Sequence, residues 1–271
     1  TAMAALEAGI DPEARIGCSG GMYFGNRYFH CHKRGGHGMQ NMRDALKNSC
    51  DVYFYSVAVR IGPDRIAKVA EAFGLGQTFD IGIPGQKKGI VPSTEWVRKN
   101  RPRDPKWHPG ESLSYGIGQG MLTVNALQLA VMTARLANGK KALNPRLIRA
   151  IGGKELASGA DVPDLPFAPE HIQYVRDGMA AATEAGASQL GLGDILMAGK
   201  TGTAQVRSYA KGGPRGGASM PWRYRDHGLF VCFAPIDAPR YAMSVIVQHG
   251  LGGSINAAPK AREIMRVALL K

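Results

Sequence analysis

The apolar and polar positions of this chain follow a helical period in most of its length and a strand period near its end. Six stretches carry apolar residues at spacings of three and four, which predicts amphipathic helices. Three later stretches are short, apolar and bounded by Gly, Pro or Asp, which predicts β-strands. The predicted helices span residues 1–7, 39–59, 64–73, 123–139, 169–185 and 256–270, and the predicted strands span residues 198–206, 228–235 and 241–248.

The order of these elements predicts the fold class. Most helices precede the strands, and helices and strands do not alternate, so we expect an α+β domain with an antiparallel sheet and packed helices. Residues 236–239 should join the last two strands as a hairpin. Gly9 should end the first helix, and the helix 123–139 should be capped by Thr123 at its start and ended by Gly139.

Two long regions show no regular period and are predicted to be irregular. They are residues 10–38, which are rich in glycine, and residues 75–112, which are rich in proline. The second region contains one short helical turn at residues 94–97. Residues 146–151 alternate like a short strand, and residues 207–227 read as a long loop beside the strand 198–206.

Composition places the chain among globular proteins. Its 271 residues are 44% hydrophobic, enough for one large domain or two small ones, and no run of about 18 apolar residues appears. Lys plus Arg exceeds Asp plus Glu by 34 to 21, giving a net charge of +13. The basic residues are spread out and no nucleic-acid motif accompanies them, which favours a surface facing an anionic membrane or cell-wall polymer.

The first candidate for chemistry lies in the strand 198–206. Lys200 supplies a positive charge, Thr201 and Thr203 supply hydroxyls, and Gly202 lets another backbone approach closely. A peptide that ends in a carboxylate could lie along such an edge and hydrogen-bond to it as an added strand. Alone, this pattern also fits an ordinary strand with one lysine.

Two further stretches give this pattern a context. Ser49-Cys50-Asp51 lies upstream, and Tyr115-Gly116-Ile117-Gly118-Gln119-Gly120 lies between. Taken in order with Lys200-Thr201-Gly202, they resemble the transpeptidase domain of the class B penicillin-binding proteins, above all of the elongation-type members. The resemblance covers residues 1–271 and implies a β-lactamase/transpeptidase-like fold, with an antiparallel sheet flanked by helices on both faces.

One element of the family pattern is missing upstream of Ser49. The Ser-x-x-Lys that carries the nucleophile and the base does not precede Ser49 in these 271 residues. In the family it opens a buried helix that residues 1–9 would continue, so we expect it just before Thr1. The family sheet has five strands, so we also expect an earlier segment to pair with the strand 241–248, which otherwise presents an aggregation-prone edge. The chain alone should be inactive.

The resemblance also implies roles for the residues that are present. Ser49 would pass a proton towards the leaving amine, and Asp51 would hydrogen-bond a neighbouring lysine. Lys200 would attract the substrate carboxylate, Thr201 and Thr203 would hydrogen-bond it, and the Thr203 N–H would form half of an oxyanion hole. The Tyr115 to Gly120 stretch can be read simply as a tight turn.

The implied activity is a peptidoglycan D,D-transpeptidase that crosslinks stem peptides and is acylated by β-lactams. The implied partners are a membrane glycan polymerase and an elongation scaffold, and the implied location is the periplasmic face of the inner membrane, with an upstream anchor. A non-catalytic penicillin-binding sensor is the main alternative, and a hydrolytic β-lactamase is a third. An intact Ser-x-x-Lys upstream would favour the enzyme.

A second group of residues predicts a metal site. Three thiols and an imidazole, the donors of a structural zinc site, are provided by Cys18, Cys31, His37 and Cys50. All but Cys50 lie in the glycine-rich region 10–38, which has little apolar content of its own. Some elongation-type relatives carry zinc in this loop, with one ligand inside the Ser49 motif, and Cys50 fits that position. A Cys18–Cys31 disulfide, buried free cysteines, and His30 or His32 in place of His37 stay open alternatives. Cys232 is read as a core residue.

Overall fold

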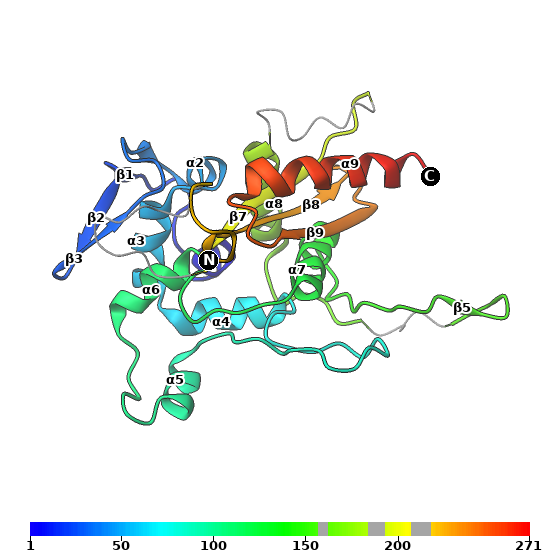
Figure 1. Cartoon of the computed structure of the whole chain (residues 1–271), viewed down its shortest axis with the longest axis horizontal. Coiled ribbons are helices and arrows are strands. Elements are labelled where there is room, and N and C mark those ends of the chain that lie inside the picture. Colours follow the sequence, from blue (N-terminus) through cyan, green and yellow to red (C-terminus); the bar gives the residue numbers. More distant parts are fainter. Residues whose placement is uncertain (157–161, 184–192, 207–217) are drawn as a thin grey trace.

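The computed structural model describes residues 1–156, 162–183, 193–206 and 218–271 (Figure 1). Within these residues, no helix is both long and apolar enough to cross a membrane. The helices are α1 Ala2–Glu7, α2 Met42–Asn48, α3 Asp51–Ile61, α4 Pro63–Ala72, α5 Thr94–Asn100, α6 Pro109–Gly116, α7 Ala126–Asn138, α8 Pro169–Thr183 and α9 Ala258–Leu269. The strands are β1 Ile16–Cys18, β2 Gly21–Phe24, β3 Arg27–His30, β4 Gly38–Gln40, β5 Ala150–Ile151, β6 Lys154–Glu155, β7 Ala198–Ala204, β8 His227–Ala234 and β9 Tyr241–Val247.

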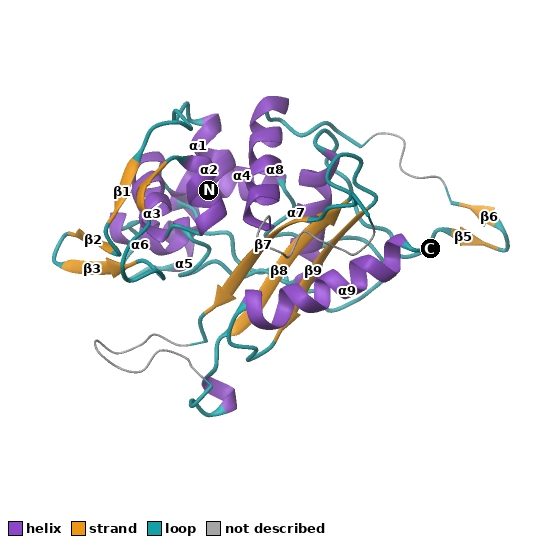
Figure 2. Cartoon of the chain, turned by 90° about the horizontal axis from the view of Figure 1, so that it is seen from above, coloured by secondary structure: helices purple, strands orange, loops and turns teal. Residues whose placement is uncertain are grey.

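The three predicted strands form one antiparallel sheet in the order β7-β8-β9. Lys200 of β7 lies opposite Val231, and β8 and β9 form the predicted hairpin. Side chains of β8 alternate between two cores: Phe230 packs towards Met265 of α9, and Phe233 packs into the main helical core. Figure 2 shows α9 across one face of the sheet and α7 and α8 behind the other. The predicted fold class, a sheet with helices on both faces, is therefore confirmed.

The other part of the molecule is a group of helices around α3. Helix α1 contacts α3, α4 and α8, and residues 2–6 are all buried. A helix on the surface buries only one face, so α1 lies inside the helical group. Tyr53 of α3 and Leu113 of α6 are among the largest fully buried side chains. In Figure 1 this group lies beside the sheet, and β7 is the strand nearest to it. The boundary between helices and sheet is therefore the edge of β7.

The prediction of an irregular region at residues 10–38 was wrong. This region forms two small antiparallel pairs, β1 with β4 and β2 with β3. Each strand has only three or four residues, which is too short for a period of two to stand out among the glycines. The pair β2–β3 is a hairpin whose Met22 and Phe29, opposite each other, pack against the core.

The prediction of a second irregular region, at residues 75–112, was partly wrong. The predicted turn at residues 94–97 is the start of α5, but α6 also begins inside this region. Helix α6 begins at Pro109, a residue that suits the first turn of a helix but also reads as a loop signal. Helix α7 begins at Ala126, not at Thr123: Asn125 forms a capping box with Gln128, while Thr123 pairs with Ile90.

Two smaller differences concern β5 and the start of α9. Of the predicted strand 146–151, only β5 is regular, and it forms an exposed hairpin with β6. The predicted helix 256–270 corresponds to α9, preceded by a π-helical turn at Gly253–Ala257. Residues 184–185 of one predicted helix and residues 207–217 of the predicted loop lie outside the described residues.

Candidate functional site

Ser49 occupies the junction between α2 and α3, which divides the predicted helix 39–59 into two. Helix α2 ends at Asn48, Cys50 is the residue before α3, and Ser49 between them has φ 53° and ψ 47°. Few residues other than glycine adopt this left-handed conformation, which costs on the order of 1 kcal/mol or more and persists only where the surroundings impose it. The junction therefore holds Ser49 in one orientation, with its side chain directed out of both helices.

The side chain of Ser49 meets Lys200 across the boundary between helices and sheet. Lys200 Nζ donates a hydrogen bond to Ser49 Oγ, joining residues 151 positions apart in the chain. The same ammonium lies 3.4 Å from the carbonyl oxygen of Thr201. Ser49, Lys200, Gly199 and Thr201 line a cavity of about 150 Å³ at this point. The fold thus brings the Ser49 and Lys200 motifs together.

Burial makes the Lys200 ammonium easier to deprotonate. It lowers the pKa of the Lys200 ammonium from 10.5 to about 8, and the negative charge of Asp51 partly opposes this shift. The ammonium therefore stays largely charged at neutral pH, yet close to the point at which it releases its proton. A buried, weakly solvated cation of this kind attracts an anionic ligand more strongly than an ammonium in water.

Asp51 lies elsewhere than the family resemblance implied. Its Oδ2 accepts a hydrogen bond of 2.7 Å from the backbone N–H of His32 and lies 3.5 Å from the His32 ring. The expected hydrogen bond to a lysine is not among the contacts of the described residues, and Asp51 acts on Lys200 only through its charge. The carboxylate instead joins the start of α3 to the segment after β3. Its catalytic role stays a prediction.

Thr201, Gly202 and Thr203 form the predicted edge, because β7 is the outer strand of its sheet. The turn at Gly253–Ala257 lies so close to Gly202 that a side chain on Gly253 would come within 2.7 Å of the Gly202 carbonyl oxygen. On the open side of the strand, Gln119 Nε2 donates a hydrogen bond of 2.6 Å to the carbonyl oxygen of Thr203. The sequence reasoning missed this contact.

The stretch that holds Gln119 does more than form a tight turn. Gly116 closes α6 against α3, where any side chain would overlap Ala58 and the Phe54 carbonyl. Gly118 and Gly120 have φ values of 78° and 79°, which favour glycine. A glutamine between two such glycines was the available signal: it marks a turn built to present one polar side chain.

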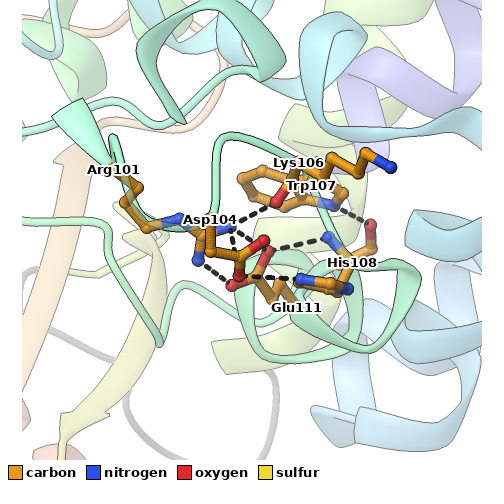
Figure 3. Close-up of polar contacts among 7 residues, drawn as sticks. Arg101, Asp104, Lys106, Trp107, His108 and Glu111 are labelled. Carbon is orange, nitrogen blue, oxygen red and sulfur yellow. Dashed lines mark hydrogen bonds and ion pairs between the residues drawn. The ribbon is translucent and has the colours of Figure 1, made fainter. Parts of the chain in front are cut away.

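A polar network fixes α6, and so the turn that follows it (Figure 3). Arg101 forms an ion pair with Glu111, and Glu111 Oε2 also accepts the backbone N–H of His108 at 2.9 Å. The His108 ring lies 2.8 Å from Asp104. Trp107 Nε1 donates to Ser112 Oγ at 2.9 Å, and its ring packs against the main core. Between α6 and the β2–β3 hairpin lies a second cavity, of about 390 Å³.

Cys18, Cys31, His37 and Cys50 come together, as the sequence predicted. Their ligand atoms all lie within 4.8 Å of one another, and the three thiols are buried. His37 Nδ1 lies 3.6 Å from Cys18 Sγ and 3.5 Å from Cys31 Sγ. A tetrahedral zinc ion, with Zn–S near 2.3 Å and Zn–N near 2.0 Å, separates such ligands by about 3.5 Å. The donor set and its spacing therefore fit zinc.

The alternatives at this cluster can now be compared with the structure. All four cysteines are free, so Cys18 and Cys31 form no disulfide. His32 Nδ1 lies 3.9 Å from Cys31 Sγ, farther than His37, and His30 lies against Arg34 instead. Burial raises the pKa of the Cys50 thiol to about 12, because a buried thiolate loses its solvation. A bound cation would stabilise the thiolate and lower this pKa. Cys232 is fully buried in the sheet, as expected of a core residue.

A serine at a helix junction, held by a lysine from the edge of an antiparallel sheet, is the arrangement of penicillin-recognising acyl-transfer domains. The comparison with known families agrees: the penicillin binding protein transpeptidase domain matches residues 1–266. The chain belongs to this family.

The particular relatives are peptidoglycan D,D-transpeptidases. The chain is 38% identical over 244 residues to MrdA of Acinetobacter baumannii and 35% identical over 242 residues to MrdA of Haemophilus influenzae, covering 88% and 86% of this chain. A solved structure of Pseudomonas aeruginosa PBP2, in complex with WCK 5153, matches the whole chain with 35% identity and a TM-score of 0.85. The chain spans 36% and 37% of the two MrdA proteins and 57% of the Pseudomonas chain.

The lowered pKa of Lys200 predicts how stability changes with pH. Between about pH 8 and pH 10.5 the unfolded chain binds more protons at this lysine than the folded chain does, so stability should rise with pH across that window. Urea unfolding of the wild type and of Lys200→Met, compared at steps from pH 7.5 to 10.5, isolates this contribution. A difference between the two proteins that does not change with pH would show that Lys200 titrates normally.

Proposed function

We propose that the protein carrying this chain is a peptidoglycan D,D-transpeptidase that crosslinks stem peptides through a serine acyl-enzyme and is acylated by β-lactams. The observation that carries the proposal is the contact of Lys200 Nζ with Ser49 Oγ at the open edge of β7. Membership of the transpeptidase family and relatives named as D,D-transpeptidases support it over a non-catalytic sensor.

The residues present account for the parts of acyl transfer other than the nucleophile. Ser49 can accept a proton from Lys200 and donate one to the leaving amine, because a hydroxyl is donor and acceptor at once. Lys200 would attract the ligand carboxylate, Thr201 and Thr203 would hydrogen-bond it, and Gly202 would leave room for its backbone. The Thr203 N–H would contribute to an oxyanion hole.

The nucleophile and its base would come from a Ser-x-x-Lys that precedes this chain in the full-length protein. The one such string in the sequence, at residues 208–211, follows Lys200 instead of preceding Ser49, so it does not match the family order. We therefore expect no penicilloyl adduct on these 271 residues alone. An adduct on Ser49 of the full-length protein would contradict the roles assigned here.

The proposed setting follows the relatives. A Helicobacter pylori PBP2, 28% identical to this chain, is solved as a complex with MreC, and another solved relative belongs to a peptidoglycan synthase complex. We place this protein likewise beside a membrane glycan polymerase and an elongation scaffold, on the periplasmic face of the inner membrane. Its net charge of +13 suits a position near anionic lipid or cell-wall polymer.

We further propose that Cys18, Cys31, His37 and Cys50 hold a structural zinc ion. The ion would neutralise the thiolates and fasten β1 and the segment after β3 to the start of α3. Because Cys50 directly follows Ser49, the cluster would also fix the backbone of the Ser49 junction. The zinc would take no part in the acyl transfer itself, since four protein ligands leave no open position.

Lys200→Ala in the full-length protein should slow acylation by benzylpenicillin about 100- to 1,000-fold, because a preorganised charge aimed at the ligand carboxylate is lost. Stopped-flow acylation rates, with mass spectrometry of the adduct, measure the effect. Lys260→Ala, on the exposed side of α9, is the matched control and should react at the parent rate. An unchanged rate in Lys200→Ala would make Lys200 an ordinary lysine.

Purified protein should contain about one zinc per chain by elemental analysis, as expected for a closed four-ligand site. Cys18→Ser should lose the metal and lower the melting temperature, because three ligands hold zinc far less tightly. Cys232→Ser serves as the control, since this buried thiol lies in the sheet and should leave the zinc content at one. Metal-free protein with a Cys18–Cys31 disulfide would exclude the site.

A further inference from the structure

The open edge of β7 is already occupied by side chains of the chain itself. Three carbonyl oxygens accept hydrogen bonds from side chains here, one from the residue just before β7 and two from β7 itself. Met197 accepts from Thr183 Oγ1 at 2.9 Å, Thr201 from Lys200 Nζ at 3.4 Å, and Thr203 from Gln119 Nε2 at 2.6 Å. Carbonyls spaced by even numbers point to the same side of a strand. A peptide that joins β7 as an added strand must therefore displace at least one of these donors.

Gln119 is the donor at the far end of this edge from the helices α8 and α2. Its side chain is half-buried, and among the described residues its one hydrogen-bond partner is the Thr203 carbonyl. An extended ligand needs the Thr203 carbonyl for one of its own amide N–H groups, because backbone pairing is what holds an added strand. Two donors, Gln119 and the ligand amide, thus compete for one acceptor.

The backbone that carries Gln119 is held firmly. Its N–H donates to the Ser114 carbonyl at 2.9 Å, and the Gly118 N–H donates to the Tyr115 carbonyl at 2.9 Å. Thr1 Oγ1 donates to the Gly116 carbonyl at 2.7 Å. The Arg101–Glu111 ion pair fixes the start of α6, the helix that precedes this turn (Figure 3). The turn therefore stays in place, and the exchange at Thr203 requires only that the glutamine side chain rotate.

We infer that the Gln119 side chain is a latch on the ligand-binding edge: it closes the Thr203 carbonyl in the free protein and is displaced by an amide N–H of the ligand. This inference rests on the proposed function, because it takes the ligand to be an acyl donor aligned with β7. The latch protects the carbonyl from pairing with other strands, as edge strands require.

The latch also discriminates between ligands. A ligand with an amide N–H at this position replaces the bond that it breaks, and one without such a group leaves Thr203 to Gln119 or to water. Removing the Gln119 side chain should therefore favour only ligands that carry this amide N–H, because the ligand amide then no longer competes with the glutamine for the Thr203 carbonyl. The gain is bounded by the net worth of one hydrogen bond, which corresponds to about 2- to 10-fold in rate.

The experiment measures acylation of the full-length protein by two β-lactams, benzylpenicillin, which has an acylamino N–H, and a carbapenem, which has none. Gln119→Ala should raise the second-order rate constant for benzylpenicillin about 2- to 10-fold and change the carbapenem value less than 2-fold. Gln119→Asn, which keeps the amide but is one methylene shorter, should behave similarly and covers the case in which the alanine variant folds poorly. Gln173→Ala, exposed on α8, is the matched control.

The outcomes separate the latch from the proposed function. Slower acylation by both β-lactams would show that Gln119 supports β7. An equal rise in both acylation rate constants would show that the substitution loosens the ligand-binding edge in general. Either result overturns the latch. If the wild type reacts with neither, the proposed function fails, and the latch is then tested by NMR of the glutamine side-chain amides. Gln119 amide protons that exchange with water as fast as those of Gln248, an exposed glutamine with no hydrogen-bond partner among the described residues, would overturn it.

Discussion

The contact between Ser49 and Lys200 is the constraint on which the site depends. It joins a helix junction to a sheet edge, two parts of the chain that are separated by 151 residues. Neither partner can move alone: Ser49 is fixed by its left-handed backbone between two helices, and Lys200 is fixed in a strand that pairs with β8 along its whole length. The helical group and the sheet must therefore each fold correctly before this one polar contact can form.

The sequence predicted the elements whose period is long enough to be read. The amphipathic helices α4, α7 and α8 and the three strands of the sheet lie where their apolar residues indicated, and the donors Cys18, Cys31, His37 and Cys50 meet as predicted. The metal itself, like the roles of Thr201 and Thr203, stays a prediction. Motif residues are easy to find in a sequence because chemistry demands particular side chains at those positions.

The parts that the sequence did not predict depend on contacts between distant segments. The strands β1 and β4 are too short to show a period, and they form because they pair with each other although the β2–β3 hairpin separates them in the chain. Asp51 was assigned to a lysine by analogy, whereas the fold directs it to the backbone of His32. Gln119 gave no signal of its own partner, since Thr203 lies 84 positions away. Spacing along the chain carries no information about such pairs.

Ser49 and Cys50 are neighbours, so one peptide unit belongs both to the candidate active site and to the thiol cluster. This adjacency sets a rule for how the protein can change over evolution. Inserting or deleting a single residue here would turn one of the two side chains away from its partners, so the junction between α2 and α3 must keep its length. The loops that supply Cys18 and His37 can still vary in length, provided that their ligands return to the same place.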